Sequence, residues 1–348
     1  MQTVAQDRLR KHRAACTQKT NLGHDVNTPS CVSIPFPFGQ PQGRIPDSMA
    51  GITPAAGLQL CPRWQILRSM RQTGQGVKAV RVALITGAAS GIGRATALAF
   101  AQTGAQRVLC DVNKEELDRT AGQVNKVSAC ILARQTDISK PAEVEALANE
   151  VHRIVPAVDV LVNNAGVYVV GGILDLTLDD WEWVLGVNLR GVIHCCHYFV
   201  PAMAKRGQGG HVANVASMYG FWPAAHVTGY LTSKFGVFGF SEALREDLRG
   251  TGIGVSTVCP GVIKTNLVQS TRLRNTGNAD ALREHLQRIY NRRNYGPEKV
   301  AAAIVRAVEH NRRLVLVSPE AKIMYHINRL CPPLSHVIAR ASTRRMFD

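Results

Sequence analysis

The sequence contains no long apolar segment of the kind that crosses a membrane. Its 348 residues are 45% hydrophobic, which is ordinary for a globular chain. No apolar run reaches the roughly 18 residues that a spanning helix needs. The length suits one large α/β domain or two small ones. We therefore expect a protein that is in solution, or that at most lies on a membrane surface.

The sequence also lacks the cysteine patterns that hold metals or form redox pairs. Its nine cysteines include no Cys-x-x-Cys and no Cys/His cluster at zinc-ligand spacing. Even the neighbours Cys195 and Cys196 lie in an apolar run that reads as a helix. We expect reduced cysteines that fill space in a core, no bound metal, and a cytoplasmic location.

Acidic residues are scarce at both ends of the chain, and the formal net charge is +16. Residues 1–78 carry ten Lys and Arg against three Asp and Glu, and residues 264–348 carry sixteen against six. No recognisable DNA- or RNA-binding motif accompanies these basic ends. We expect no nucleic-acid partner, and we interpret the ends as solvated tails or as contacts with anionic lipid or substrate.

Residues 1–78 show no sustained hydrophobic period and are punctuated by proline and glycine near residues 34–43. We predict that this basic extension is mostly disordered. The charges around Arg8 could belong to an organelle transit peptide. An unstructured extension, or a translation that starts too far upstream, is favoured because no apolar face accompanies those charges.

From Ala79 onwards, short apolar runs alternate with segments whose apolar residues recur every three or four positions. The strand-like runs are Val80–Thr86, Arg107–Asp111, Ala129–Gln135, Val158–Asn163, Gly210–Ala216, Gly252–Cys259 and Arg313–Val317. The predicted helices include Gly91–Thr103, Pro141–Ile154, Val187–Lys205, Gly229–Leu248 and Pro297–His310. This alternation predicts an α/β fold over residues 79–318, a Rossmann-type, doubly wound, parallel seven-stranded sheet with helices on both faces.

A glycine-rich turn, Thr86-Gly-Ala-Ala-Ser-Gly-Ile-Gly93, follows the first predicted strand and opens a helix. Free backbone amides and the helix dipole at such a start attract a pyrophosphate. Gly87 permits the tight turn, Gly91 lets the backbone approach the phosphates, and Gly93 lets the helix pack close to the strand. The motif predicts a dinucleotide site, although the glycines would also suit a tight turn without a ligand.

Asp111 ends the second predicted strand, 18 residues after Gly93. An acid at this place can accept hydrogen bonds from both hydroxyls of an adenosine ribose, and it repels a 2′-phosphate. Val112 and Asn113 supply no arginine that could neutralise a phosphate. We therefore expect NAD rather than NADP. The alternative is that Asp111 only caps the helix that begins near Asn113.

Tyr230 and Lys234 are four residues apart, and Ser217 precedes Tyr230 by thirteen positions. On a helix, positions i and i+4 share a face, so the ammonium can lie beside the phenol and favour its ionised form. A tyrosine tuned in this way can move protons near neutral pH. Taken alone, the pair is more typical of an exposed helix face, but the motifs around it favour catalysis.

Together these motifs resemble those of the short-chain dehydrogenase/reductases, in the same order, over about two-thirds of the chain. Asn163-Asn-Ala-Gly166 is similar to the family's sheet-stabilising motif after the fourth strand. The resemblance implies a catalytic set of Ser217, Tyr230, Lys234 and Asn188. It also implies a cofactor site made by Thr86, Gly87, Ser90, Gly91, Ile92, Gly93, Asp111, Asp137, Ile138, Asn164, Ala165, Gly166, Tyr230, Lys234, Pro260, Gly261, Ile263 and Thr265.

The roles implied by the resemblance agree with the chemistry of these side chains. Tyr230 would exchange a proton with the substrate oxygen, which Ser217 would orient by hydrogen bonding. Lys234 would lower the tyrosine pKa and hold the nicotinamide ribose. Asn188 would hold, through its backbone, a water that connects Lys234 to solvent.

The segments that follow the carboxyl ends of the strands, where substrates bind in such sheets, are apolar and aromatic. We expect them to bind a lipophilic alcohol or ketone, or alternatively to be half buried in the core. With Ser217, the predicted substrate-binding residues are Tyr168, Met218, Phe221, Trp222 and Leu267.

Residues 271–293 are predicted to form a helical lid that is rich in arginine. The arginines could meet an anionic substrate tail such as that of a coenzyme A thioester, but a solvated helix face is the favoured interpretation. They are Arg272, Arg274, Arg283, Arg288, Arg292 and Arg293.

Residues 319–348 extend beyond a minimal domain of this family. Between Glu320 and Arg345 they form a basic amphipathic pattern that is broken at Pro332-Pro333. Such a helix could contact a membrane surface, or pack on the domain or across a subunit interface.

The sequence thus predicts an NAD-dependent oxidoreductase that interconverts a lipophilic secondary alcohol and its ketone. Two alternatives remain open: an acyl-thioester dehydrogenase or reductase guided by the arginine-rich lid, and a catalytically silent NAD-binding scaffold. By analogy with the family we expect a homodimer or homotetramer that associates through Val187–Lys205 and Gly229–Leu248.

Overall fold

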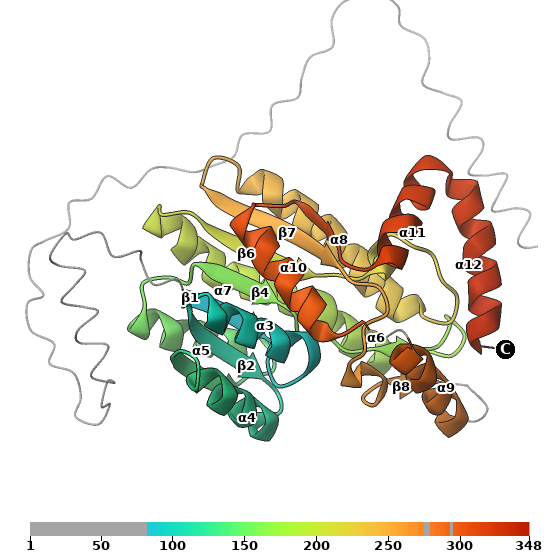
Figure 1. Cartoon of the computed structure of the whole chain (residues 1–348), viewed down its shortest axis with the longest axis horizontal. Coiled ribbons are helices and arrows are strands. Elements are labelled where there is room, and N and C mark those ends of the chain that lie inside the picture. The colour runs from blue at the N-terminus through green and yellow to red at the C-terminus, as the bar shows by residue number, and fades with distance from the viewer. Residues whose placement is uncertain (1–81, 275–278, 293–294, 348) are drawn as a thin grey trace, which may run out of the picture. The chain divides into compact units, whose positions relative to one another are not determined.

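A seven-stranded parallel sheet forms the centre of the computed structural model, which describes residues 82–274, 279–292 and 295–347 (Figure 1). The strand order is β3-β2-β1-β4-β6-β7-β9. The bounds are β1 Val82–Thr86, β2 Gln106–Asp111, β3 Cys130–Gln135, β4 Val160–Asn163, β6 Gly210–Val215, β7 Ile253–Cys259 and β9 Leu314–Leu316. The predicted Rossmann-type sheet is confirmed. The predicted disorder of residues 1–78 lies outside the described residues.

Helices cover both faces of this sheet because each presents an apolar stripe to it. One face carries α3 Gly91–Gln102, α4 Lys114–Asn125 and α10 Pro297–Glu309, and the other carries α5 Pro141–Ile154, α7 Gly191–Arg206 and α8 Thr228–Asp247. On the first face, Phe100, Leu109, Leu117 and Ile304 are buried in one core cluster. The chain changes direction between β1 and β4, which is where a doubly wound sheet opens a crevice for ligands.

The predicted helix Val187–Lys205 is part of a longer helical run that contains an irregular turn. Helix α6, Leu178–Leu185, leads through a π-helical turn, Gly186–Arg190, into α7. The turn contains Asn188, whose side chain pairs with the backbone of Val167 instead of facing solvent. Single π turns of this kind are common at functional sites.

A second, two-stranded sheet was not predicted. Strand β5, Val169–Val170, pairs in parallel with β8, Arg272–Leu273, and α9, Ala279–Arg292, follows β8. This pairing fixes the base of the predicted lid next to the segment that follows β4. The predicted break at Pro332-Pro333 is present, since α11, Pro319–Leu330, ends just before α12, Pro332–Phe347.

Across the described part of the chain, none of the helices combines the length and the apolar character that a bilayer crossing requires.

A buried chain of polar side chains joins two central strands to α8. The Asn163 amide on β4 donates to the Asn214 side-chain oxygen on β6 at 2.8 Å, and the Asn214 amide donates to the Ser241 hydroxyl at 2.9 Å. Ser241 in turn donates to the Val237 carbonyl within α8. Since α8 carries Tyr230 and Lys234, these bonds help to set the position of that helix relative to the sheet.

We expect Asn214→Ala to lower the free energy of unfolding by about 1–3 kcal/mol, because it removes the acceptor of the buried Asn163 amide and the donor to the Ser241 hydroxyl. Urea denaturation followed by circular dichroism measures this. Lys205→Ala, at an exposed site on α7, is the control and should change stability by less than about 0.5 kcal/mol. Equal stability of Asn214→Ala and the parent protein would mean that the polar chain does not stabilise the fold.

Candidate active site

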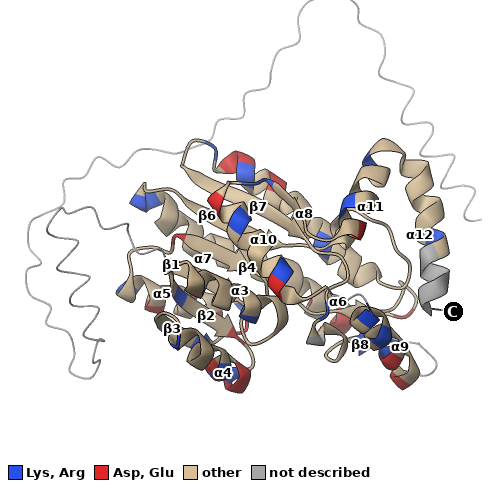
Figure 2. Cartoon of the chain, in the orientation of Figure 1, with Lys and Arg blue, Asp and Glu red and all other residues tan. Residues whose placement is uncertain are grey.

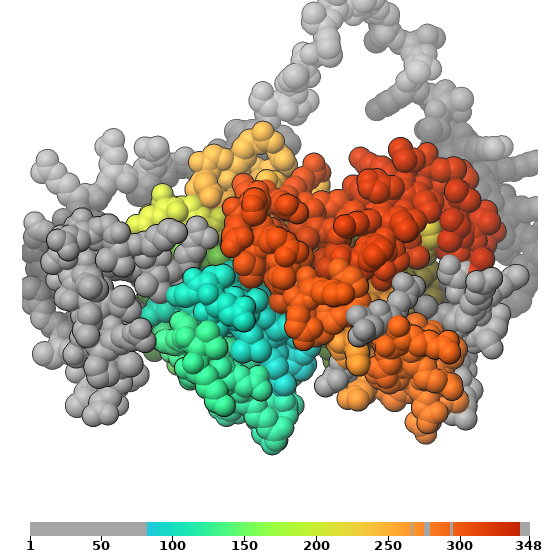
Figure 3. Space-filling model, viewed as in Figure 1, coloured from blue at the N-terminus to red at the C-terminus, as the bar shows by residue number. Residues whose placement is uncertain are grey.

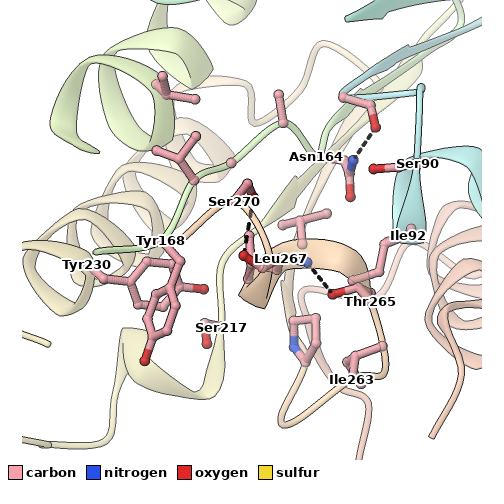
Figure 4. Close-up of a pocket in the computed structure, with 18 of the residues that line it drawn as sticks. Ser90, Ile92, Asn164, Tyr168, Ser217, Tyr230, Ile263, Thr265, Leu267 and Ser270 are labelled. Carbon is pink, nitrogen blue, oxygen red and sulfur yellow. Dashed lines mark hydrogen bonds between the residues drawn. The ribbon is translucent and has the colours of Figure 1, made fainter. Parts of the chain in front are cut away.

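A cavity of about 810 Å³ opens at the carboxyl ends of the central strands and extends from the glycine turn to α8. Figure 4 shows Ser90 and Asn164 at one end of it and Tyr168, Ser217 and Tyr230 at the other. Most of the predicted cofactor residues line it, namely Gly87, Ser90, Gly91, Ile92, Asp111, Asp137, Ile138, Asn164, Ala165, Gly166, Tyr230, Lys234, Pro260, Gly261, Ile263 and Thr265.

The other two predicted cofactor residues, Thr86 and Gly93, lie beneath this surface and shape it. A Cβ atom on Gly93 would lie 1.9 Å from the Gly87 carbonyl oxygen, so that only glycine lets α3 begin this close to β1. The Thr86 hydroxyl accepts hydrogen bonds from the amides of Asn164 and Ala165. The Asn164 side chain donates to the carbonyl oxygens of Thr86 and Gly87.

The glycine turn fits a dinucleotide pyrophosphate. Gly87 and Gly91 have φ angles of +65° and +50°, which side chains rarely adopt. A Cβ on Gly91 would meet Thr265 at 3.3 Å, so the absence of a side chain there keeps the crevice open. Ser90 precedes the first turn of α3, where backbone amides lack helical partners and can bind an anion.

Asp111 stands at the end of β2 beside this turn. Its two carboxylate oxygens accept hydrogen bonds from the backbone amides of Ala89 and Asn113, at 3.0 and 2.9 Å. The N-cap of α4 is Asn113, whose side chain accepts from Glu116, so Asp111 is not the capping residue. A carboxylate has about four acceptor positions, so Asp111 retains capacity for ribose hydroxyls.

An arginine that the sequence reasoning did not consider, Arg94, also lines this end of the cavity. Its guanidinium pairs with Glu116 at 2.6 Å and donates to the Thr120 hydroxyl and the Ala89 carbonyl. The cation is therefore already paired with a carboxylate within the chain. Glu116 and Asp111 together place two acids at the part of the cavity where an adenosine ribose would lie.

At the other end, Tyr230 is surrounded by aromatic rings. Tyr168 and Tyr219 contact its ring edge to face, with centroids 4.5 and 6.2 Å away. Burial raises the pKa of Tyr230 to about 12, and the neighbouring Ser217 hydroxyl opposes that shift. This direction is opposite to the lowered pKa that we expected from Lys234, because the loss of hydration on burial is the largest effect on the phenol.

Lys234 lies beside Tyr230 on α8, as the spacing predicted, with its ammonium 5.8 Å from the centre of the tyrosine ring. The ammonium donates to the Val215 carbonyl oxygen at the end of β6, at 2.9 Å. Burial lowers the pKa of Lys234 to about 8, because a buried cation loses its hydration. The nearby Cys259 thiol acts in the opposite direction.

Asn188 does not line the cavity but supports it from behind. Its side-chain oxygen accepts from the Val167 amide at 2.7 Å, and its nitrogen donates to the Val167 carbonyl and the Ser233 hydroxyl. A Cβ on Gly166 would lie 3.3 Å from the Asn188 oxygen and 3.6 Å from the Lys234 nitrogen. Asn188 and Lys234 therefore converge on Gly166.

Of the residues predicted to bind substrate, Tyr168, Met218, Leu267 and Ser217 line the cavity, but Phe221 and Trp222 do not. The Phe221 ring packs edge to face against Phe238 of α8 and Tyr325 of α11. Trp222 is buried outside the cavity as well. The sequence could not show this, because the partner helix α11 lies a hundred residues further along the chain.

The rest of the apolar lining near Tyr230 comes from segments in which the sequence shows no motif. Leu286 on α9 joins Tyr168 and Tyr230 in one apolar cluster, and Tyr290 of α9 and Trp183 of α6 pack against it. The lining residues that the sequence analysis did not name as site residues include Ala89, Arg94, Glu116, Trp183, Val187, Tyr219, Gln269, Ser270, Leu286 and Tyr290. The amphipathic pattern of α9 is the one signal that could have indicated Leu286.

Three arginines of the predicted lid segment bind groups within the chain and so attach the lid to the domain. Arg274 binds both oxygens of Asp180 at 2.7 Å, and Arg272 bridges Asp179 and Asp180 while lying over the Trp183 ring. Asp180 is fully buried at the start of α6, and these contacts hold its pKa well below the usual range.

Arg283, the third of them, donates to backbone carbonyls of residues 268, 269 and 271. Arg288 and Arg292 are exposed, and Arg293 lies outside the described residues.

The model of a family described as short chain dehydrogenase matches residues 81–276. The chain belongs to the short-chain dehydrogenase/reductase family, whose members are oxidoreductases that bind NAD or NADP.

Two curated relatives and one solved structure illustrate the similarity. The chain is 37% identical over 283 residues to "Probable oxidoreductase EphD" of Mycobacterium tuberculosis, covering 80% of this chain and 48% of that protein. The chain thus spans about half the length of that relative. It is 34% identical over 249 residues to the C alpha-dehydrogenase of a Sphingobium species, covering 70% of this chain and 82% of that protein.

The solved structure is a short-chain dehydrogenase/reductase from Burkholderia phymatum in complex with NAD. It matches with a TM-score of 0.66 and 32% identity, over 72% of this chain and 94% of that one.

Lys234→Met should change the pH dependence of stability. Unfolding restores the lysine's ordinary pKa of about 10.4, so between about pH 8 and pH 10.4 the unfolded chain holds a proton that the folded chain has lost. Over that range the parent protein should gain stability relative to the variant as the pH rises. Urea denaturation at a series of pH values measures the difference.

The control for this prediction is Lys322→Met, because Lys322 is exposed on α11. It should show no such pH-dependent difference. A constant difference between Lys234→Met and the parent from pH 7 to pH 10.4 would contradict a lowered pKa for Lys234.

Proposed function

We propose that this protein is an NAD-dependent oxidoreductase that interconverts a lipophilic secondary alcohol and its ketone. The observation that carries the proposal is the convergence of Tyr230, Ser217 and Lys234 on an apolar cavity that continues into the glycine turn. In this reaction the bound nicotinamide supplies the hydride acceptor or donor. The protein supplies the proton and holds the substrate oxygen.

Tyr230 is the proposed proton donor and acceptor. With its pKa raised, the phenol keeps its proton at neutral pH, which suits donation to the oxygen of a ketone. In the direction of oxidation the phenol must first lose that proton, and the Lys234 ammonium beside it stabilises the phenolate. Ser217 holds the substrate oxygen, since a hydroxyl can both donate and accept a hydrogen bond.

The choice of NAD over NADP is supported by the charges around the adenosine end. Asp111 and Glu116 are both acids, and the one arginine among the described residues lining that end, Arg94, already pairs with Glu116. A 2′-phosphate would meet two carboxylates there, which is unfavourable at short range.

An apolar substrate is supported by the lining of the catalytic end. Tyr168, Met218, Leu286 and Tyr290 surround Tyr230 with apolar and aromatic surface. Some of the arginines that could bind the phosphates of a thioester already have other partners. Arg272, Arg274 and Arg283 bind groups within the chain. This weakens the thioester alternative relative to a simple lipophilic alcohol.

Tyr230→Phe should reduce turnover by about 10²–10⁴-fold, because it removes the hydroxyl that exchanges the proton. NAD binding should remain within about twofold of the parent value, since phenylalanine keeps the aromatic ring at this place in the cofactor site and the glycine turn is distant from the change. Absorbance of reduced nicotinamide, with a panel of steroid, retinoid and long-chain alcohols, measures turnover. Tyr198→Phe on α7 is the matched control and should retain full activity.

A catalytically silent scaffold would bind NAD, show no turnover with any alcohol, and be indifferent to Tyr230→Phe. Turnover that survives Tyr230→Phe would instead contradict the proposed proton transfer.

Asp111→Ala should weaken NAD binding by about 10- to 100-fold, the effect of losing charged hydrogen bonds to ribose hydroxyls. The ratio of NADP affinity to NAD affinity should rise, because one repelling carboxylate is gone. Calorimetric titration with each cofactor measures both constants. The control Asp118→Ala, on the exposed side of α4, should change neither, and an unchanged ratio in Asp111→Ala would contradict the assignment of Asp111.

A further inference from the structure

The two C-terminal helices, α11 and α12, carry an exposed surface that the cavity does not use. The inner side of α11 is held by the domain. Asn328 donates to the Phe221 carbonyl, Tyr325 packs on the Phe221 ring, and Glu320 accepts from the Val262 amide. The Ser335 hydroxyl of α12 donates to the Asn328 side chain, which joins the second helix to the first. Helix α11 is thus attached to the domain, and α12 is attached to α11.

Large apolar side chains remain exposed on the outer side of both helices. The exposed fractions are 60% for Ile323, 82% for Leu330, 45% for Leu334 and 63% for Val337. Four such residues within fifteen positions are a dense group of exposed apolar side chains, and such groups commonly mark an interaction site. In the space-filling view the two helices form a lobe at one end of the visible face (Figure 3).

The charged residues that are exposed on the described part of these helices are basic. Lys322, Arg329 and Arg340 are exposed, and residues 321–347 include five Lys or Arg but no Asp or Glu. Figure 2 shows blue and no red along the described part of α12. A surface of this length without any acid differs from the rest of the domain, where most exposed helices mix both signs, as α4 does.

The two kinds of residue form parallel stripes on α11. Ile323 and Leu330 are seven positions apart and therefore share a face, and Lys322 and Arg329, one position earlier, lie alongside them. Aliphatic side chains next to long basic ones are the arrangement with which an interfacial helix enters a lipid headgroup layer. The basic side chains reach the phosphates while the aliphatic ones contact the acyl boundary.

We propose that the outer surface of α11 and α12 docks the protein onto an anionic lipid bilayer. A second copy of the chain fits this surface less well, because a two-fold contact would bring basic residues against basic residues. The subunit contacts that we expect through α7 and α8 use other helices. A nucleic acid would leave the aliphatic side chains without a favourable partner, since bases stack on aromatic rings. Docking does not depend on the proposed reaction.

Vesicle co-sedimentation with the full chain tests this proposal. The parent protein should bind vesicles of phosphatidylcholine and phosphatidylglycerol, and should bind pure phosphatidylcholine at least about tenfold more weakly. The double variant Leu330→Ser/Leu334→Ser should bind the anionic vesicles about tenfold more weakly than the parent. The double variant Lys322→Glu/Arg329→Glu should lose about tenfold or more, and the loss should shrink at high salt.

Matched controls separate this surface from general effects of an exposed leucine or an exposed charge. Leu174→Ser and Arg249→Glu change an exposed leucine and an exposed arginine elsewhere on the domain, and should leave vesicle binding within about twofold of the parent. Cofactor binding, measured on the same samples, confirms that each variant is folded.

Three outcomes would overturn the proposal. Binding that is unaffected by both double variants would assign any vesicle affinity to another part of the chain. Dissociation of an oligomer by Leu330→Ser/Leu334→Ser, seen by light scattering without any loss of vesicle binding, would identify the surface as a subunit interface. Equal binding to neutral and anionic vesicles would remove the role of the basic residues.

Discussion

The close contact between the glycine turn and the segment after β4 is the constraint on which the rest of the site depends. There is no room for a side chain on Gly93, because its Cβ atom would overlap the Gly87 carbonyl oxygen. The Asn164 side chain binds the same turn to the end of the neighbouring strand. These bonds join β1, α3 and β4 at the point where the chain changes direction. The crevice for a dinucleotide is therefore a consequence of how the sheet is wound.

The catalytic end depends on a second set of buried polar contacts. Asn163 and Asn214 link the central strands to α8, and Asn188 reaches from a π-helical turn to the backbone that follows β4. Lys234 closes the arrangement by donating to the end of β6. The bonds of Asn163, Asn214 and Lys234 are buried, so they help to set the position of α8, which carries Tyr230, relative to the sheet.

The parts that could be predicted from the sequence are those encoded locally. Strands appear as apolar runs, the turn as spaced glycines, and the Tyr230–Lys234 pair as a four-residue interval, so these predictions located the fold and most of the cavity lining. Contacts between distant segments had no such signal. The two-residue strands β5 and β8 are too short to show a period, and Phe221 faces a helix far along the chain. The raised pKa of Tyr230 could not be predicted either, because it results from burial. That burial comes from Tyr168 and other residues that are distant in the sequence.

The pairing of β5 with β8 has a consequence for redesigning the protein. Strand β8, which precedes the lid helix α9, is hydrogen bonded to β5 after β4, and Asp180 of α6 pairs with Arg272 and Arg274. A lid segment taken from a relative would arrive without the matching strand β5 and the Asp180 carboxylate. Residues 167–183 and 268–292 should therefore be exchanged together in a chimera. A chimera that takes both segments from one relative should preserve the cavity, whereas one that takes a single segment would leave a buried charge unpaired.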